Sequence, residues 1–584
     1  MKAQWFLWAA AVTAMGLWAA CNASSHSGLG DDDDGVGAQG NHTGTAGAAG
    51  IDFDPDSGPP CDTHCSADLH NLLDCHENVL QTCEGDQGCS PSGGCVPACQ
   101  SATENASTFG CDFYSVTPAC IAEARGGCFA VLISNTWNAP IDVAAEYGGQ
   151  PLAGQYVYVP QGQGAGLTYQ PLAGQLQPGQ LAILFLDQWA SGDIFQVNCP
   201  VAPALQVQTQ LDGTGFGQSF HITTTAPVVA YDVYPWGGAS SYVTSATLLV
   251  PTPTWGTNFV TADAWTAYNG YPFTQVVAAQ DGTTVTMVPV ANVDGGGGLP
   301  SIPANVPTTF SLNRGQVAQF LQTARLAGSV LSSDKPISVW GGSSCMNIPD
   351  DATTACDAAH QQLVPVQMLG NEYVAARYPS RGGNDQAPYT IIGMVDGTQF
   401  WYDPMPAGAP ATLNRGQTAI FLTDQPFLVS SQDADHPFYM AAHMTGGSTN
   451  GDGVGDPEYT NLVPPKQYLA YYLFATDPTY QHTALVFVRQ KGSDQQFHDV
   501  NLACLGAVPD WQPVGGSGQY EVSRIMLVND GVGIGACNNG VQTATSDVPF
   551  GLWIWGYDPY ASYGYPGGMS VAPINQVVVP PVPR

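Results

Sequence analysis

The sequence predicts an all-β protein, in which tandem β-sandwich-like repeats follow a small disulfide-rich module. Three observations predict this fold class. Short apolar runs bounded by turn-forming residues recur along most of the chain, three sequence markers recur in one order about a hundred residues apart, and cysteines are concentrated between residues 61 and 128. A β-propeller built from the same repeats is the alternative fold.

The chain begins with an export signal. Lys2 precedes an apolar run at residues 5–17 that is too short to span a bilayer in the mature protein. The run ends in Leu-Trp-Ala-Ala-Cys at 17–21, which is similar to the lipobox of bacterial lipoproteins, although leucine stands four residues before the cysteine instead of three. We therefore predict lipid attachment at Cys21, with ordinary cleavage after residue 20 as the alternative. The predicted location is an outer-membrane lipoprotein, the cell surface or the extracellular space, with membrane contact only through the N-terminal lipid.

A linker and a cysteine-rich module are predicted next. Residues 21–60 contain almost no large apolar groups, which predicts a disordered Gly/Asp/Ser linker. Residues 61–99 hold seven cysteines, and two short apolar segments at 72–75 and 79–83 predict a hairpin between them. A module of this size has too small a core to fold without staples, so we expect disulfides to hold it together.

The rest of the chain consists of strand-like segments. Apolar runs such as those at 129–134, 181–186 and 485–488 have Gly, Pro, Asn or Asp close by, a pattern typical of buried strands separated by turns. With 68 Gly, 45 Pro and 10% aromatic residues, the composition also favours strand and turn over helix.

Three markers define an internal repeat. Leu-Asn-Arg-Gly-Gln occurs at 312–316 and 413–417, with a diverged copy at 176–180; Leu-Val-Pro occurs at 249–251, 363–365 and 462–464; and strands led by proline begin at Pro227, Pro336, Pro437 and Pro549. A repeat of about a hundred residues suits one β-sandwich of immunoglobulin size. A propeller blade needs only about 40 to 50 residues, so the alternative requires two blades per repeat and gives one closed ring instead of a row.

These patterns give a domain map. We predict a signal peptide at 1–20, the linker at 21–60, the module at 61–99 and four β repeats at 100–269, 270–384, 385–480 and 481–584.

Sixteen cysteines in an exported chain indicate disulfides. Sequence neighbours predict four bonds: Cys99 with Cys111, Cys120 with Cys128, Cys345 with Cys356, and Cys504 with Cys537. This pairing leaves Cys199 without a predicted partner. The order of the bonds among the six cysteines from 61 to 95 stays open.

The charge balance excludes one class of partner. The chain has 13 Lys and Arg against 47 Asp and Glu, a net charge of −34. Nucleic acid and anionic membrane surfaces need clustered cations, so neither is an expected partner. The sequence does not indicate an oligomeric state.

No catalytic residue is predicted. The sequence lacks the Gly-x-Ser-x-Gly elbow of hydrolases and the His-Glu-x-x-His motif of zinc proteases. The more suggestive residues are aromatic: Tyr560, Tyr563 and Tyr565 lie in a Gly/Pro-rich segment after a predicted strand, where exposed rings often contact a ligand.

No cofactor is expected, with calcium as the alternative. Asn450, Asp452, Asp456 and Glu458 stand at even spacings in a glycine-rich stretch that could curl around a cation. The plainer alternative is that Asn, Gly and Asp form an ordinary long turn.

A family resemblance adds to this interpretation. Gly-Cys-Asp-Phe-Tyr-Ser-Val at 110–116, the strand at 129–135, Gly-Asn-Glu-Tyr-Val at 370–374 after a Leu-Val-Pro element, and Gly-Asp-Pro-Glu-Tyr at 455–459 follow in a specific order. In this order they resemble bacterial, myxobacterial-type lipoproteins that carry the IgG-Fc-binding-protein N-terminal domain, over roughly residues 61–580. The resemblance implies a secreted or surface protein without an assigned reaction or catalytic residues, and it does not carry antibody binding to this chain.

The predicted function is therefore binding. We expect a cell-surface or secreted adhesion protein that recognises an extracellular glycan or protein and is not an enzyme. A secreted hydrolase acting on extracellular polysaccharide or protein is the alternative.

Overall fold

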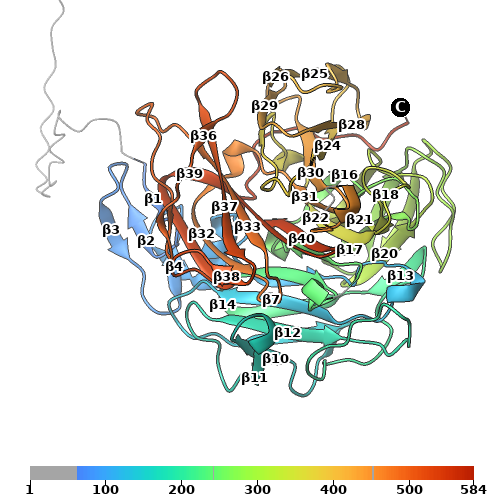
Figure 1. Ribbon diagram of the computed structural model, residues 1–584, viewed down its shortest axis with the longest axis horizontal. Helices are drawn as coiled ribbons and strands as arrows, with labels where there is room; N and C mark the ends of the chain where they lie inside the picture. The colour runs from blue at the N-terminus through green and yellow to red at the C-terminus, as the bar shows by residue number, and fades with distance from the viewer. Residues whose placement is uncertain (1–61, 241, 384, 450–452, 584) are drawn as a thin grey trace, which may run out of the picture. The chain divides into compact units, whose positions relative to one another are not determined.

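A computed structural model describes residues 62–240, 242–383, 385–449 and 453–583 (Figure 1). The predicted signal peptide, the linker with Cys21, and two of the candidate calcium ligands, Asn450 and Asp452, lie outside these residues. Strands make up nearly all of the regular structure, so the all-β prediction is confirmed. No helix in the described residues is long and apolar enough to cross a membrane.

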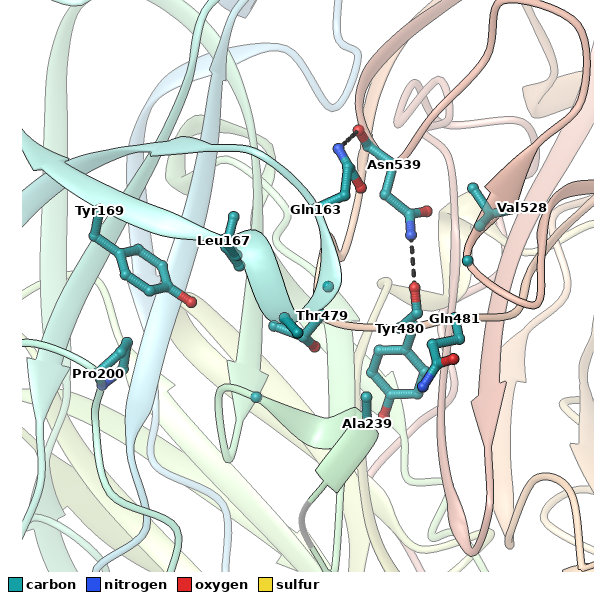
Figure 2. Close-up of a pocket in the computed structure, with 14 residues that line it drawn as sticks. Gln163, Leu167, Tyr169, Pro200, Ala239, Thr479, Tyr480, Gln481, Val528 and Asn539 are labelled. Carbon is teal, nitrogen blue, oxygen red and sulfur yellow. Dashed lines mark hydrogen bonds between the residues drawn. The ribbon is translucent and has the colours of Figure 1, made fainter.

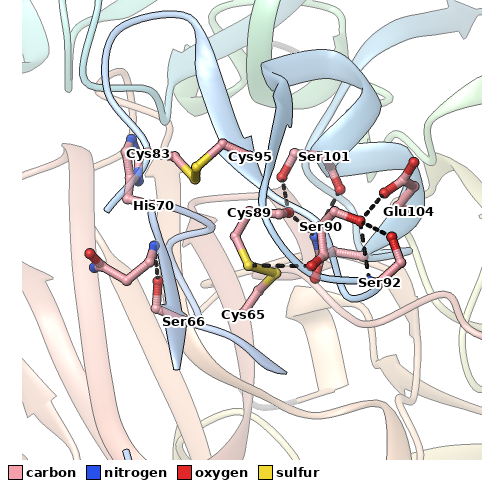
Figure 3. The surroundings of a disulfide bond; sticks show 12 residues. Cys65, Ser66, His70, Cys83, Cys89, Ser90, Ser92, Cys95, Ser101 and Glu104 are labelled. Carbon is pink, nitrogen blue, oxygen red and sulfur yellow. Dashed lines mark hydrogen bonds between the residues drawn. A yellow bond between two sulfur atoms is a disulfide. The ribbon is translucent and has the colours of Figure 1, made fainter. Parts of the chain in front are cut away.

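The cysteine-rich module consists of short strands and one helix. Its elements are β1 (His64–Cys65), β2 (Asn71–Leu73), β3 (Val79–Thr82), β4 (Gln87–Cys89), β5 (Cys95–Pro97) and α1 (Ala98–Glu104). β2 and β3 form the predicted hairpin. Disulfides join Cys65 to Cys89 and Cys83 to Cys95, and Ser101 of α1 donates a hydrogen bond to the carbonyl of Cys89 at 2.7 Å (Figure 3). Covalent bonds thus take the place of a large core.

The four repeats contain the remaining strands. The first holds β6 (Gly110–Ser115), β7 (Phe129–Asn135), β8 (Val143–Tyr147), β9 (Gln150–Pro151), β10 (Val157–Gln161), β11 (Thr168–Pro171), β12 (Leu181–Asp187), β14 (Phe220–Tyr234) and β15 (Ser245–Leu248). The second holds β13 (Gly215–Gln218), β16 (Gly256–Val260), β17 (Pro272–Ala278), β18 (Thr283–Val288), β19 (Thr308–Leu312), β20 (Gln316–Leu321), β21 (Val330–Met346) and β22 (Asp357–Leu363).

The third repeat holds β23 (Glu372–Ala375), β24 (Ala387–Gly393), β25 (Thr398–Gln399), β26 (Trp401–Asp403), β27 (Thr412–Leu413), β28 (Thr418–Thr423), β29 (Phe427–Ser430), β30 (Phe438–Met444) and β31 (Glu458–Asn461). The fourth holds β32 (Leu469–Thr476), β33 (Thr483–Gln490), β34 (Asn501–Leu502), β35 (Gly506–Ala507), β36 (Gln512–Pro513), β37 (Tyr520–Asn529), β38 (Val532–Gly533), β39 (Gly540–Asp558) and β40 (Ala561–Pro566). Short 3-10 turns are η1 (Ala122–Ala124), η2 (Gly164–Gly166), η3 (Gly238–Ser240), η4 (Thr252–Thr254), η5 (Val366–Met368), η6 (Gly447–Thr449) and η7 (Pro465–Gln467).

A long strand organises each repeat. The first half of β14 pairs with β6 and β8, and its second half pairs with β7 and β15. β21 and β39 pair with their neighbours in the same way. Pro227, Pro336 and Pro549 lie where the pairing changes, because proline has no N–H to continue a ladder. In the third repeat the long strand is broken into β29 and β30, and Pro437 precedes the second piece.

The two halves of a repeat enclose a core. Phe220 at the start of β14 packs against Phe129 of β7, with ring centroids 5.8 Å apart. In the second repeat, Phe310 of β19 packs against Phe320 of β20, with ring centroids 5.5 Å apart. These contacts agree with the predicted sandwich-like repeat, in which apolar side chains fill the space between two layers of strands.

The sheets begin earlier than the predicted boundaries. β16, β23 and β32 precede residues 270, 385 and 481, yet each pairs with the long strand of the following repeat. Each Leu-Val-Pro element ends one sheet, and a 3-10 turn then leads into the first strand of the next. The strands β16, β23 and β32 thus follow the Leu-Val-Pro elements at 249–251, 363–365 and 462–464, although β13 of the second sheet lies before the first of these elements.

The four repeats in the described residues form a ring. Their last strands, β15, β22, β31 and β40, meet at the centre, where β15 contacts β22 and β40, and β31 contacts the same two strands. Figure 1 labels three of these strands, β22, β31 and β40, close together. The ring is closed by the chain ends of this part, since Thr108 N donates to Met569 O at 2.9 Å and Val571 N donates to Ala106 O at 2.8 Å. The repeats are thus not in a row. A closed ring is the arrangement that the propeller alternative predicts. Here, however, each position in the ring is occupied by one whole repeat instead of by one blade.

Three of the four predicted disulfides between neighbours are present: Cys99–Cys111, Cys345–Cys356 and Cys504–Cys537. The fourth prediction, Cys120 with Cys128, is wrong. Cys128 bonds to Cys199, which lies 71 residues away in sequence but beside it in space, because Cys128 N donates to Val197 O at 2.9 Å. Cys120 is the free cysteine of the described residues, and its sulfur accepts a hydrogen bond from Gln210 at 2.8 Å.

Candidate functional site

A cavity of about 670 Å³ lies where the first and last repeats meet, and we call it the seam pocket (Figure 2). The first repeat contributes the loop between β10 and β11, the segment after the Cys128–Cys199 disulfide and the turn after β14. The last repeat contributes the turn between β32 and β33 and the ends of β37 and β39. The lining residues are Gln163, Gly164, Ala165, Leu167, Tyr169, Pro200, Gly237, Ala239, Thr479, Tyr480, Gln481, Val528, Gly531 and Asn539.

Hydrogen bonds between the two repeats fix the walls of this pocket. Gln163 Nε2 donates to the carbonyl of Asn539 at 2.7 Å, and Gly164 N donates to the carbonyl of Pro478 at 3.0 Å. Asn539 Nδ2 in turn donates to the carbonyl of Tyr480 at 2.9 Å. Both walls of the pocket are therefore fixed in the absence of a ligand.

Tyr169 offers a hydroxyl on the first-repeat side. Its Oη accepts a hydrogen bond from Trp236 Nε1 at 2.9 Å, and its ring packs edge-on against Phe185 with centroids 5.4 Å apart. Burial raises the pKa of Tyr169 to about 12, so the phenol stays protonated at neutral pH. Because the indole supplies the accepted bond, the phenol hydrogen remains to be donated.

Tyr480 forms the floor on the last-repeat side. It is 2% exposed, and its ring packs edge-on against Tyr563 with centroids 4.7 Å apart. A Cβ added at Gly238 would collide with Tyr480 Oη, so the close approach of the two repeats here requires glycine.

The predicted aromatic contacts are mostly buried. Tyr563 is 2% exposed and Tyr565 is fully buried, whereas Tyr560 is 42% exposed. The expected loop is in fact a turn at Tyr560, where φ is +53°, followed by β40, a central strand of the ring. The prediction that Tyr563 and Tyr565 are surface contacts is therefore wrong, because both are core residues. Tyr560 stays a surface candidate.

The seam pocket has no charged side chain in its lining, but carboxylates lie just behind it. Asp477 is 1% exposed, and burial raises its pKa to about 6. Both carboxylate oxygens of Asp558 accept a hydrogen bond from the backbone N–H of Gln481, at 3.1 and 3.0 Å. The surroundings of this uncharged pocket are thus negative.

A Ser–His–Asp chain at the centre of the ring was not signalled by any sequence motif. Ser245 Oγ lies 2.8 Å from His360 Nδ1, and His360 Nε2 lies 2.5 Å from Asp232 Oδ1. These are the residue types of a hydrolase triad. All three residues are fully buried, however, so no substrate can reach the serine in this structure. The chain joins the first repeat to the second.

The candidate calcium ligands that the structure describes are buried instead of exposed on a loop. Asp456 Oδ1 accepts a hydrogen bond from Gly447 N at 3.2 Å, and Glu458 Oε1 accepts one from Tyr459 N at 2.7 Å. Burial raises the pKa of Asp456 to about 7 and that of Glu458 well above its usual value. Among the described residues, no group of three or more His, Cys, Asp or Glu is arranged to hold a metal ion.

Comparison with protein families gives one match. A family model described as IgGFc binding protein matches residues 245–556, more than half of the chain. The resemblance expected over roughly 61–580 is thus found for a shorter segment, which runs from β15 into β39. Comparison with curated proteins gives no match. The matched segment includes the last-repeat wall of the seam pocket and leaves out the loop from Gln163 to Tyr169.

Proposed function

Since the chain belongs to the IgGFc-binding protein family, we propose that it is an extracellular binding or adhesion protein that recognises a glycan or a protein and performs no chemical step. The name of the family describes binding to a protein, which is compatible with this role. Antibody Fc is not proposed as the ligand, because similarity of a domain does not fix its partner.

The observation that carries the proposal is the seam pocket. It has the volume of a small-ligand site and a lining of apolar and uncharged polar side chains. It lies between two repeats whose positions are fixed by direct hydrogen bonds. The hydrolase alternative gains no support from Ser245, His360 and Asp232, because these side chains are buried.

The proposed location is the outer surface of the cell, with a lipid on Cys21. Labelled palmitate should enter the wild-type protein and not the Cys21→Ser variant. A mature wild-type protein without lipid mass would refute the anchor, while the binding role could still hold for a released protein.

Binding is tested with the purified full chain. We expect it to retain at least one component when it is screened on a glycan array and against the extracellular matrix of the producing organism. Heat-denatured protein is the control for nonspecific adsorption. If the folded chain retains nothing above this control in either screen, the proposed function is wrong.

A further inference from the structure

We propose that the seam pocket binds a neutral saccharide, held by Tyr169, Gln481 and Gln163. This inference rests on the proposed binding function and names the ligand class for one site. A cavity of about 670 Å³ is within the range of sites that bury most of a small ligand.

Electrostatics select a neutral ligand. The chain carries a net charge of −34, and no cationic side chain lines the pocket to offset it. Asp558 accepts a hydrogen bond from the backbone N–H of Gln481, and Asp530, adjacent to the lining residue Gly531, has an 82% exposed side chain. His482 pairs with both carboxylates, at 2.9 and 3.1 Å, and they raise the pKa of its imidazole, but one imidazolium offsets only one of the two negative charges. A uronic acid, a sialic acid or a sulfated sugar would therefore be repelled from this pocket.

The available polar groups match hydroxyls. Within the described residues, the side-chain amide of Gln481 makes no hydrogen bond, so both its N–H donors and its oxygen are open to a ligand. Gln163 Nε2 donates to the carbonyl of Asn539 on the opposite wall, which leaves Gln163 Oε1 as an acceptor for a ligand. Tyr169 can donate the hydrogen of its hydroxyl. Because a sugar hydroxyl both donates and accepts, a set of amides and a phenol can satisfy several of them at once.

The two sides of the pocket also differ in polarity. Figure 2 shows Tyr169, Leu167 and Pro200 on one side, and on the other Gln481 and Asn539 together with the apolar Val528. A pyranose ring has an apolar C–H face and a polar rim, so it can lay its face on the first side and direct hydroxyls to the second. The fixed walls lower the entropy that binding would otherwise cost.

The experiment measures binding of named glycans to the full chain by isothermal titration. The neutral probes are a β-glucan, a mannan and N-acetylchitohexaose, and the anionic probes are polygalacturonate and hyaluronan. We expect at least one neutral probe to bind and neither anionic probe to do so. Gln481→Ala should weaken that binding roughly tenfold through the loss of its hydrogen bonds, and Ala165→Trp, at an exposed lining position, should abolish it by filling the pocket.

The matched control is Gln170→Ala. Gln170 follows Tyr169 on β11, is exposed and does not line the pocket, so its removal should leave affinity unchanged. Unchanged melting temperatures show that the variants fold. If a neutral glycan binds but Gln481→Ala and Ala165→Trp do not weaken it, the site is elsewhere and the inference is refuted. If no neutral glycan binds while the chain still retains a matrix protein, the inference fails and the proposed function stands. If nothing is retained, both fail.

Discussion

Replacement of the buried Asp477 by asparagine should stabilise the protein at pH 8 and have little effect at pH 4. Asp477 is 1% exposed, its Oδ1 accepts a hydrogen bond from Thr479 N at 2.7 Å, and within the described residues its Oδ2 has no partner. Burial raises its pKa from 3.8 to about 6. The folded state therefore holds this proton more tightly than the unfolded chain does.

The magnitude follows from the linkage between pKa and stability. Since one pKa unit equals about 1.4 kcal/mol, a rise from 3.8 to about 6 corresponds to about 3 kcal/mol. The contribution of the protonated group is present below pH 4 and is lost as the pH rises to about 6, because the folded state binds the extra proton in that window. Asparagine has the shape of the protonated acid and cannot ionise. Asp477→Asn should thus match the wild type at pH 4 and be about 3 kcal/mol more stable at pH 8.

The assay is urea unfolding with disulfides intact, followed by tryptophan fluorescence at both pH values. Subtraction of the wild-type free energy of unfolding from that of the variant removes the contribution of every other titrating group. The control is Asp547→Asn, because the Asp547 side chain is 93% exposed and its ion pair with His498, at 3.8 Å, is a surface pair of little energy, so its replacement should have a small effect at both pH values. If the difference for Asp477→Asn does not change between pH 4 and pH 8, burial does not hold this carboxyl protonated.

Three further predictions concern other buried groups. Arg381→Met should destabilise the protein by about 2 kcal/mol in urea at pH 7, because Asp385 loses its closer arginine partner, at 2.8 Å, and keeps Arg377 at 3.3 Å, while the carbonyl of Thr445 loses its donor; an unchanged midpoint would contradict this. Iodoacetamide should label the half-buried Cys120 slowly in the folded protein at pH 8 and rapidly after unfolding, since desolvation raises the pKa of its thiol to about 11; rapid labelling of the folded protein would refute the raised pKa. Millimolar calcium should leave the melting temperature unchanged, because Asp456 is buried and its raised pKa favours the neutral acid. A calcium-dependent rise that Asp456→Asn removes would instead establish the site.

The sequence predicted local features well, because strands and repeats each produce a pattern within a short stretch of neighbouring residues. The Leu-Val-Pro elements and the four prolines indicated four β repeats, and the prolines lie at equivalent places in the sheets. The pairing of β16, β23 and β32 with the next sheet was not predicted, since nothing in the sequence shows that these strands pair forward.

Features that depend on long-range contacts were missed. Cys128 bonds to Cys199 because the chain returns beside it after β12, and pairing by sequence neighbour cannot show this. Tyr563 lies in a segment with the composition of a loop, but pairing with β39 makes that segment a central strand. The seam pocket joins Gln163 and Tyr169 to Gln481, residues far apart in sequence that the closed ring brings together.

The meeting of β15, β22, β31 and β40 at one centre also constrains how this protein can change in evolution. An open solenoid can gain or lose a unit at little cost, because each unit contacts only its neighbours along the row. Here each repeat contacts at least two others at the centre, and residues 106–108 are joined to residues 569–571. Deletion of one repeat would expose the apolar faces of the two repeats beside it. A duplicated repeat could not add its last strand to the four that already meet at the centre. We therefore expect related chains to keep the number of repeats and to vary in length in their outer loops.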